Sequence, residues 1–159
     1  MFNYNSRKYR PVALVDAIWL AFVTQTKYMT DSEYLEKFRT QLDVVKAAGG
    51  EICIHPGLVL DELTRMDKSG STKKAEINLA TKASKQRFEG ALFLVKSNQG
   101  RYGRLTQELA NDFNKGRDSY PKTLTEAYKL MLHNMRDQDT RHQPHGDDGL
   151  AFSTVRIPG

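Results

Sequence analysis

The chain has 159 residues and a net charge of +5, with 39% hydrophobic and 27% charged residues, a composition that argues against wholesale disorder. Its apolar runs are much shorter than the roughly 20 residues that span a bilayer, and the single cysteine, Cys53, excludes an internal disulfide. We therefore expect a cytoplasmic protein with no membrane partner, consisting of one domain or of two small lobes.

The first predicted elements are a leader and a helix. Residues 1–11 are basic and polar, and they lack the apolar core of a signal peptide. After them, apolar residues recur at the spacing of one helix face until the pattern stops near Thr26. This stripe consists of Val12, Val15, Ile18, Trp19, Phe22 and Val23. We predict an amphipathic helix over this stretch.

The second predicted helix begins at a capping box, Thr30-Asp31-Ser32-Glu33. In this motif the Thr30 hydroxyl accepts from the Glu33 amide while the Glu33 carboxylate reaches back to the start of the helix. Gly49-Gly50 is expected to end the helix, because glycine adopts the left-handed cap at no steric cost. The residues predicted to face the core are Tyr34, Leu35, Phe38, Leu42 and Val45.

A connector, a short helix and a loop are predicted next. Pro56 is expected to keep residues 51–57 out of a helix. The apolar residues of Leu58–Met66 then predict a short helix. Residues 67–74 are polar and include Ser69-Gly70-Ser71-Thr72, which is typical of a loop.

A long helix is predicted over Ala75–Asn98. Its beginning is basic and is expected to be exposed. Leu92–Val95 is apolar on every side, so this end is expected to be deeply buried. Gly100–Gly103 is then predicted to form a turn.

Two more helices complete the predicted fold. Leu105, Leu109 and Phe113 mark a shorter helix that stops near Gly116. A second capping box, Thr123-Leu124-Thr125-Glu126, starts the last helix. That helix is expected to bury Leu124, Ala127, Tyr128, Met131, Leu132 and Met135.

Residues 137–159 are rich in polar residues and are predicted to be a flexible tail. No segment alternates apolar and polar residues over the length of a strand, and there is no internal repeat. We therefore predict an all-α fold of five or six helices, with a helical domain over residues 12–136, arranged as one bundle or as two small lobes.

The positive charge is concentrated in residues 65–87, where seven basic residues stand against two acidic ones. This surplus of +5 equals the net charge of the whole chain. Such a cluster is suited to binding RNA by neutralising phosphates, and it is equally compatible with a solvated helix face. The candidate nucleic-acid residues are Lys73, Lys74, Lys82, Lys85 and Arg87.

The residue patterns of common enzymes are missing. Cys53 and His55 offer two ligands where zinc requires three or four, and His142 lies in the predicted tail. The same pair has no flanking feature that would lower the pKa of the thiol for nucleophilic catalysis. There is no phosphate-binding glycine loop followed by Lys-Ser or Lys-Thr. We expect no catalytic residues, no cofactor, no metal and no small-molecule substrate.

The order of several short segments resembles the capsid region of copia-type LTR retrotransposon Gag proteins. In the first half, the likeness lies in Ser32-Glu33-Tyr34-Leu35-Glu36-Lys37-Phe38 followed by Gly49-Gly50. In the second half it lies in Ala91–Leu94, Arg101–Leu105, Leu109–Phe113, Gly116 and Tyr120–Tyr128. The likeness covers about residues 12–136, and it depends on the joint order of these pieces, since each piece alone is ordinary for a helix.

The resemblance implies a helical structural protein that self-associates into virus-like particles enclosing the RNA of the element. The self-association candidates are Trp19, Phe22, Met131 and Met135. Several features of Gag polyproteins are absent, above all the zinc knuckle, so a capsid fragment or a Gag remnant retained by a host also fits. The rival hypothesis is a helical nucleic-acid-binding module in which the basic cluster is the functional site.

Overall fold

The described part of the structure is built from helices. A computed structural model describes residues 23–47 and 55–142, with side chains up to residue 135. Within these ranges there is no strand, and the predicted all-α fold is confirmed. The helices are α2 (Asp31–Ala47), α3 (Pro56–Arg65), α4 (Lys74–Val95), α5 (Gln99–Asn114) and α6 (Leu124–His142).

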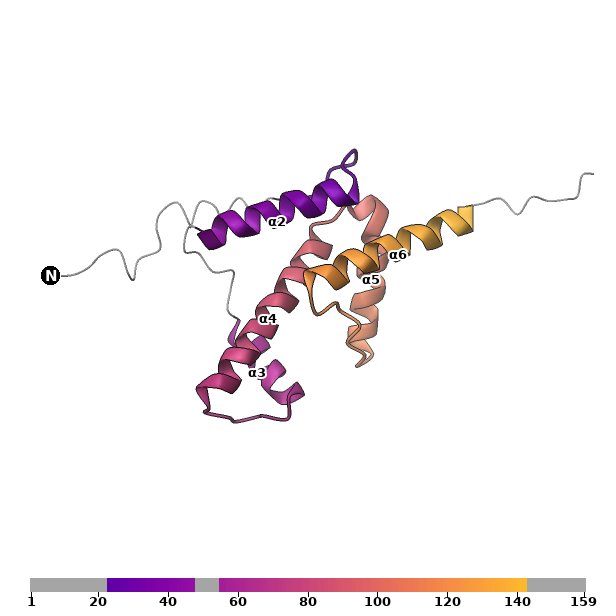
Figure 1. Ribbon diagram of the computed structural model, residues 1–159. Coiled ribbons are helices and arrows are strands. Elements are labelled where there is room, and N and C mark those ends of the chain that lie inside the picture. The colour runs from indigo at the N-terminus through magenta and orange to yellow at the C-terminus, as the bar shows by residue number, and fades with distance from the viewer. Residues whose placement is uncertain (1–22, 48–54, 143–159) are drawn as a thin grey trace, which may run out of the picture.

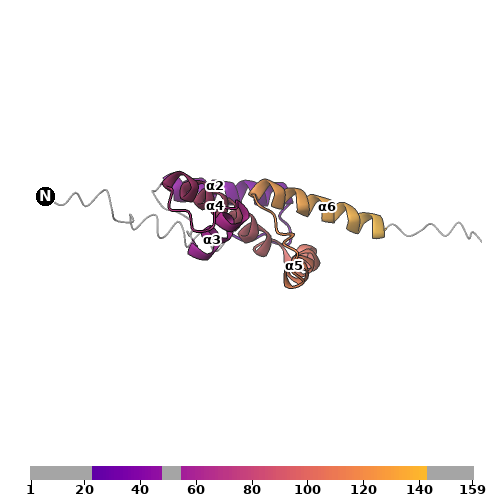
Figure 2. The same ribbon diagram turned by 90° about the horizontal axis from the view of Figure 1, so that it is seen from below.

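The other described helices are arranged around α4 (Figure 1). α3 packs along the N-terminal half of α4, and α2, α5 and α6 gather at its C-terminal half. Seen from below, α2 and α6 lie in a layer with α4, and α5 lies beneath that layer (Figure 2). Because α4 takes part in both groups of contacts, the described helices form one connected unit.

An aromatic cluster between α2 and α4 lies at the centre of the core. The ring of Tyr34 stacks on that of Phe93 with 4.4 Å between centroids, and Phe38 packs edge-on against both. All three side chains are fully buried. The Tyr34 hydroxyl donates to the Phe93 carbonyl oxygen at 2.8 Å, and this carbonyl is one of the four that a helix C-terminus leaves without a partner. Burial raises the pKa of Tyr34, so the hydroxyl keeps its proton and remains a donor.

The two predicted capping boxes both form, with one difference. At α2, the Glu33 amide donates to Thr30 Oγ1 at 3.2 Å and the Thr30 amide donates to Glu33 Oε2 at 2.8 Å. At α6, the Glu126 amide donates to Thr123 Oγ1 at 3.2 Å. The Glu126 carboxylate, however, accepts from the Lys122 amide at 2.8 Å, so the return bond is shifted by one residue.

Two predicted breaks turn out to be helix starts. Pro56 is the first residue of α3, so the prediction that it keeps the chain out of a helix is wrong. Proline suits this position because the first turn of a helix needs no amide donor. The predicted turn at Gly100–Gly103 is also wrong, since these residues form the first turn of α5. Asn98 caps that turn by accepting from the Arg101 amide at 3.1 Å.

Other helix ends differ from the predictions by a few residues. The first predicted helix and Gly49-Gly50 lie largely or wholly outside the described residues, and residues 23–26 are not helical. α4 ends at Val95, three residues before Asn98, and α6 continues to His142, into the stretch predicted as a tail.

The end of α4 is buried less completely than predicted. Phe93 and Leu94 are fully buried, but Leu92 is half-buried and Val95 is 60% exposed. A segment that is apolar on every side therefore has one side that the described helices do not cover.

The contact between α4 and the start of α6 depends on a glycine. A Cβ atom at Gly90 would lie 2.8 Å from the Thr123 carbonyl oxygen, which is closer than side-chain carbons approach backbone atoms. Thr123 is held in place because it also caps α6. Gly90 is therefore the residue that lets the backbones of α4 and α6 approach each other.

We predict that Gly90→Ala lowers the free energy of unfolding by about 1–3 kcal/mol, because the added methyl group forces α6 away from α4. Urea denaturation followed by circular dichroism measures this change. The matched control is Gly103→Ala in α5, where the nearest atom to a new Cβ is 3.8 Å away. The control is expected to stabilise the protein by up to about 1 kcal/mol through helix propensity, and equal effects at the two sites would contradict the close contact.

Candidate functional site

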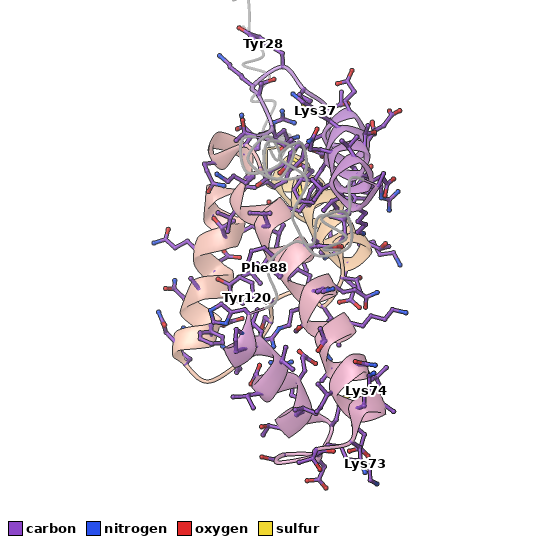
Figure 3. The ribbon with its side chains drawn as sticks, turned by 90° about the vertical axis from the view of Figure 1, so that its left-hand side faces the viewer. Tyr28, Lys37, Lys73, Lys74, Phe88 and Tyr120 are labelled. Carbon is purple, nitrogen blue, oxygen red and sulfur yellow. The ribbon has the colours of Figure 1, made fainter. Side chains whose placement is uncertain are left out.

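The fold divides the predicted basic cluster. Lys73 and Lys74 lie at the tip of the hairpin formed by α3 and α4 and point away from the body (Figure 3). Lys82 is also exposed, about two turns further along α4, and Lys85 is half-buried. Lys73 thus immediately precedes α4, and the other three lysines lie between the first residue of α4 and its middle.

Arg87 lies instead in the interior, where it is 8% exposed. Its Nη1 donates to Asp61 Oδ2 at 2.6 Å and to Glu62 Oε1 at 3.0 Å, and its Nη2 donates to Asp118 Oδ2. Arg65 also pairs with Asp118. The guanidinium of Arg87 is bonded to these partners and almost fully buried, so its predicted contact with RNA is corrected to a structural role.

This ion-pair cluster connects three parts of the chain. Asp61, Glu62 and Arg65 belong to α3, Arg87 belongs to α4, and Asp118 belongs to the α5–α6 connection. The cluster therefore holds α3 against α4. It also attaches both helices to the connection that follows the C-terminal end of α5. The pairing of Asp61, Glu62 and Asp118 with Arg87 was missed in the sequence because these carboxylates lie 25 or more positions away from it.

The charged groups in the cluster shift one another's pKa. Burial alone raises the pKa of Asp118, but hydrogen bonds from Arg65 and from the Tyr120 amide, together with the charge of Arg87, bring it below the ordinary range. Burial alone lowers the pKa of Arg87, but the hydrogen bond to Asp61 and the charge of Asp118 bring it above its usual value. Arg87 and Asp118 are therefore both charged at neutral pH.

These ion pairs also change the charge balance of the region. The three carboxylates around Arg87 come from outside residues 65–87, and they offset three of the five surplus positive charges. At the tip, Glu76 Oε1 lies 3.5 Å from Lys68 Nζ and 3.8 Å from Lys73 Nζ. One carboxylate thus faces two ammonium groups, and the Lys73 side chain stays 78% exposed. The remaining basic residues are Lys68, Lys73 and Lys74 at the hairpin tip, where Asp67 and Glu76 partly balance them, and Lys82 and Lys85 further along α4.

The structure places the self-association candidates very differently. Met131 is fully buried in the core, so it is not available as a surface contact. Met135 is half-buried at the edge of the core, and Leu132, which was predicted to be buried, is 36% exposed. Trp19 and Phe22 lie outside the described residues.

A hollow of about 620 Å³ lies along α2 and is open to solvent. Tyr28, Glu33, Glu36 and Lys37 are among its lining residues, and Figure 3 shows Tyr28 and Lys37 on this side of the molecule. Glu33 serves as the α2 capping residue, and its hydrogen bonds with the Thr30 amide and hydroxyl lower its pKa. Its carboxylate is therefore engaged in holding the helix start.

Over residues 23–47 and 55–142, no three His, Cys, Asp or Glu side chains are grouped so that they could hold a metal ion. In the same part of the chain, no helix combines the length and apolar character needed to cross a bilayer. Comparison of the chain with models of known protein families, with curated proteins and with solved structures finds no match.

We predict that Arg87→Met lowers the free energy of unfolding by about 2–4 kcal/mol at pH 7, because it leaves three carboxylates close together and partly buried. Urea denaturation measures this loss. The control is Arg104→Met, which removes an exposed pair with Glu108 within α5 and is expected to cost about 0.5 kcal/mol or less.

The same pair of variants has an expected pH dependence. Because the folded state lowers the pKa of Asp118, its contribution is fully present above the ordinary carboxyl pKa of about 4 and is lost as the pH falls through the lower folded value. The stability gap between wild type and Arg87→Met should therefore narrow between pH 7 and pH 3. A constant gap would show that Arg87 acts through packing and not through charge.

Proposed function

We propose that this protein is a structural protein of the Gag capsid type, which self-associates into cytoplasmic particles enclosing retroelement RNA and acts without catalysis. The order of segments that resembles copia-type Gag supports this proposal, as does the all-helical architecture. The observation that carries the self-association is the position and surface of α6.

α6 extends past the body of the molecule at its C-terminal end (Figure 1). Tyr128, Leu132 and Met135 share one side of this helix because they are four and three residues apart. Tyr128 and Met135 pack on the core with part of their surface open, and Leu132 is 36% exposed. On this side of α6, apolar surface therefore extends from the core to the outside of the molecule.

A second copy of the chain is the occupant that fits this side of α6. Two α6 helices packed around a two-fold axis would each cover the Leu132 of the other, so a single patch serves both partners. Capsid-type shells need such symmetric contacts in combination with others. The α6 contact is proposed as one of the contacts between copies from which such a shell is assembled.

We expect the protein to form dimers or larger assemblies at micromolar concentration and moderate salt, as measured by analytical ultracentrifugation over a wide concentration range. Leu132→Glu places a charge in the contact and is expected to weaken association by about tenfold or more, equivalent to about 1.4 kcal/mol. The matched control is Leu79→Glu, the same change at a 56% exposed position of α4. A strict monomer for the wild type, or equal weakening by both variants, would contradict the proposal.

A second candidate function is RNA binding by the hairpin tip. It is favoured by the exposure of Lys73, Lys74 and Lys82, and by the sharing of a single carboxylate, Glu76, between Lys68 and Lys73. Exposed ammonium groups on a projecting hairpin can reach phosphates that the body of the protein does not approach.

The triple variant Lys73→Glu/Lys74→Glu/Lys82→Glu is expected to weaken binding of single-stranded RNA and to reduce the salt dependence of the affinity, measured by fluorescence anisotropy at several salt concentrations. The control Lys115→Glu/Lys122→Glu/Lys129→Glu makes the same change in net charge at exposed lysines elsewhere. If the two triple variants lose affinity equally, the tip is not a binding site, and only the overall charge matters.

A further inference from the structure

The loop before α2, residues 26–30, is held from the inside by one arginine of α5. Arg101 Nη2 donates to the carbonyl oxygens of Thr26 and Lys27, each at 3.2 Å, and to that of Met29 at 2.6 Å. Three backbone carbonyls are thus bonded to a single guanidinium. The loop therefore keeps a defined shape although it lies at the surface.

The side chain that this loop presents to solvent is Tyr28. Its carbonyl neighbours point inward to the guanidinium, whereas Tyr28 is 89% exposed, and Figure 3 shows it projecting beyond the body of the molecule. Lys27 Nζ lies 5.9 Å from the centre of the ring. A tyrosine on a loop of fixed shape loses little conformational freedom when it binds, so it is suited to anchor a contact with another molecule.

The hollow of about 620 Å³ adjoins Tyr28 and extends along the outward face of α2. The α2 residues of this face lie together because they are three or four positions apart, and Val44, which is 41% exposed, continues the face toward the end of the helix. A projecting ring and a concave surface therefore lie next to each other. The α2 residues that line the hollow are Glu33, Glu36, Lys37, Thr40 and Gln41.

Two opposite charges lie side by side near the middle of this face. Glu36 and Lys37 are both exposed, and neither forms an ion pair with the residues that the structure describes. Together with Glu33, the Glu36 carboxylate repels phosphates, so RNA is a poor occupant of the hollow. A face that carries both charges, a projecting ring and a hollow is complementary to itself, as a two-fold contact requires.

We propose that a second copy of the chain occupies this face, with the two α2 helices antiparallel about a two-fold axis between Glu36 and Lys37. Glu36 of each copy then faces Lys37 of the other, and Tyr28 of each copy faces Val44 of the other. The spacing agrees with this pairing. Val44 lies about 11 Å along α2 from the axis, and the start of α2 lies about 8 Å on the other side, so the loop reaches the level of Val44 in the second copy.

The α2 contact uses different residues from the α6 contact, and only its place in a particle rests on the proposed function. One two-fold contact closes at two copies. Two different two-fold contacts join each copy to two neighbours, so that assembly continues past the dimer. The α2 contact therefore supplies the second kind of contact that a shell requires.

Charge reversal tests the contact, in a Leu132→Glu background that disables the α6 contact. Glu36→Lys and Lys37→Glu each place like charges opposite one another twice in a two-fold contact, and each is expected to weaken association by about tenfold. In an equimolar mixture, the two basic residues of one variant face the two acidic residues of the other. The mixture is therefore expected to regain the affinity of the Leu132→Glu protein, as measured by analytical ultracentrifugation.

The control makes the same reversals at exposed residues of α2 that do not line the hollow, Arg39→Glu and Asp43→Lys. These variants should associate like the Leu132→Glu protein, both alone and mixed. An absence of recovery in the mixture of Glu36→Lys with Lys37→Glu would overturn the proposal, and it is the result expected if another part of the same chain fills the hollow. The α6 contact is judged separately, from the effect of Leu132→Glu itself, so the two proposals can fail independently.

A double-variant cycle in the same background tests Arg101 as the residue that positions Tyr28. Tyr28→Ala is expected to weaken association by about tenfold, whereas Leu60→Ala, at a 63% exposed position of α3, should leave it unchanged. Arg101→Met is expected to weaken association because it releases the loop. Combining it with Tyr28→Ala should cost no more than the larger single loss. Additive losses would contradict a role of Arg101 that acts through Tyr28.

Discussion

The C-terminal end of α4 is the point on which the rest of the described structure depends. A helix end leaves four carbonyl oxygens without partners, and a buried helix end must find donors for them. Here the donors come from three directions: the Tyr34 hydroxyl from α2, the Gln25 amide from the preceding segment, and the Gln99 side chain from α5. Each donor fixes the position of the element that carries it. One requirement for hydrogen bonding therefore brings α2, α5 and residues 23–30 together around the end of α4.

A second set of contacts acts near the middle of α4, and it is electrostatic. Arg87 has a planar guanidinium with several donors, so it can bond to carboxylates from α3 and from the α5–α6 connection at once. A lysine at this position has a single ammonium group and would not match that geometry. The cluster explains why a segment with a large surplus of basic residues does not present all of that charge to solvent. Only the basic side chains that folding leaves at the surface can contribute to binding a polyanion.

The sequence predicted the features that depend on neighbouring residues, and missed those that depend on distant ones. The capping boxes at Thr30 and Thr123, the core face of α2 and the all-α class follow from local patterns, and they are confirmed. Pro56 and Gly100–Gly103 were misjudged because the same residues that break a helix interior are tolerated in its first turn. Arg87 is a candidate surface contact in the sequence because its burial is decided by partners far along the chain, such as Asp118, whereas the burial predicted for Met131 in the last helix is confirmed.

The surfaces proposed to contact other molecules lie near opposite ends of α4. Its C-terminal half is packed against α2, α5 and α6 of the described residues. That leaves the exposed lysines at the hairpin tip, and the outer side of α6, which lie on elements at opposite ends of the molecule (Figures 1 and 3). A protein that assembles through one surface and contacts RNA through the other needs such a separation, because phosphate binding would otherwise compete with the contact between copies. The arrangement of the helices satisfies this condition, and α4 is the element that creates it.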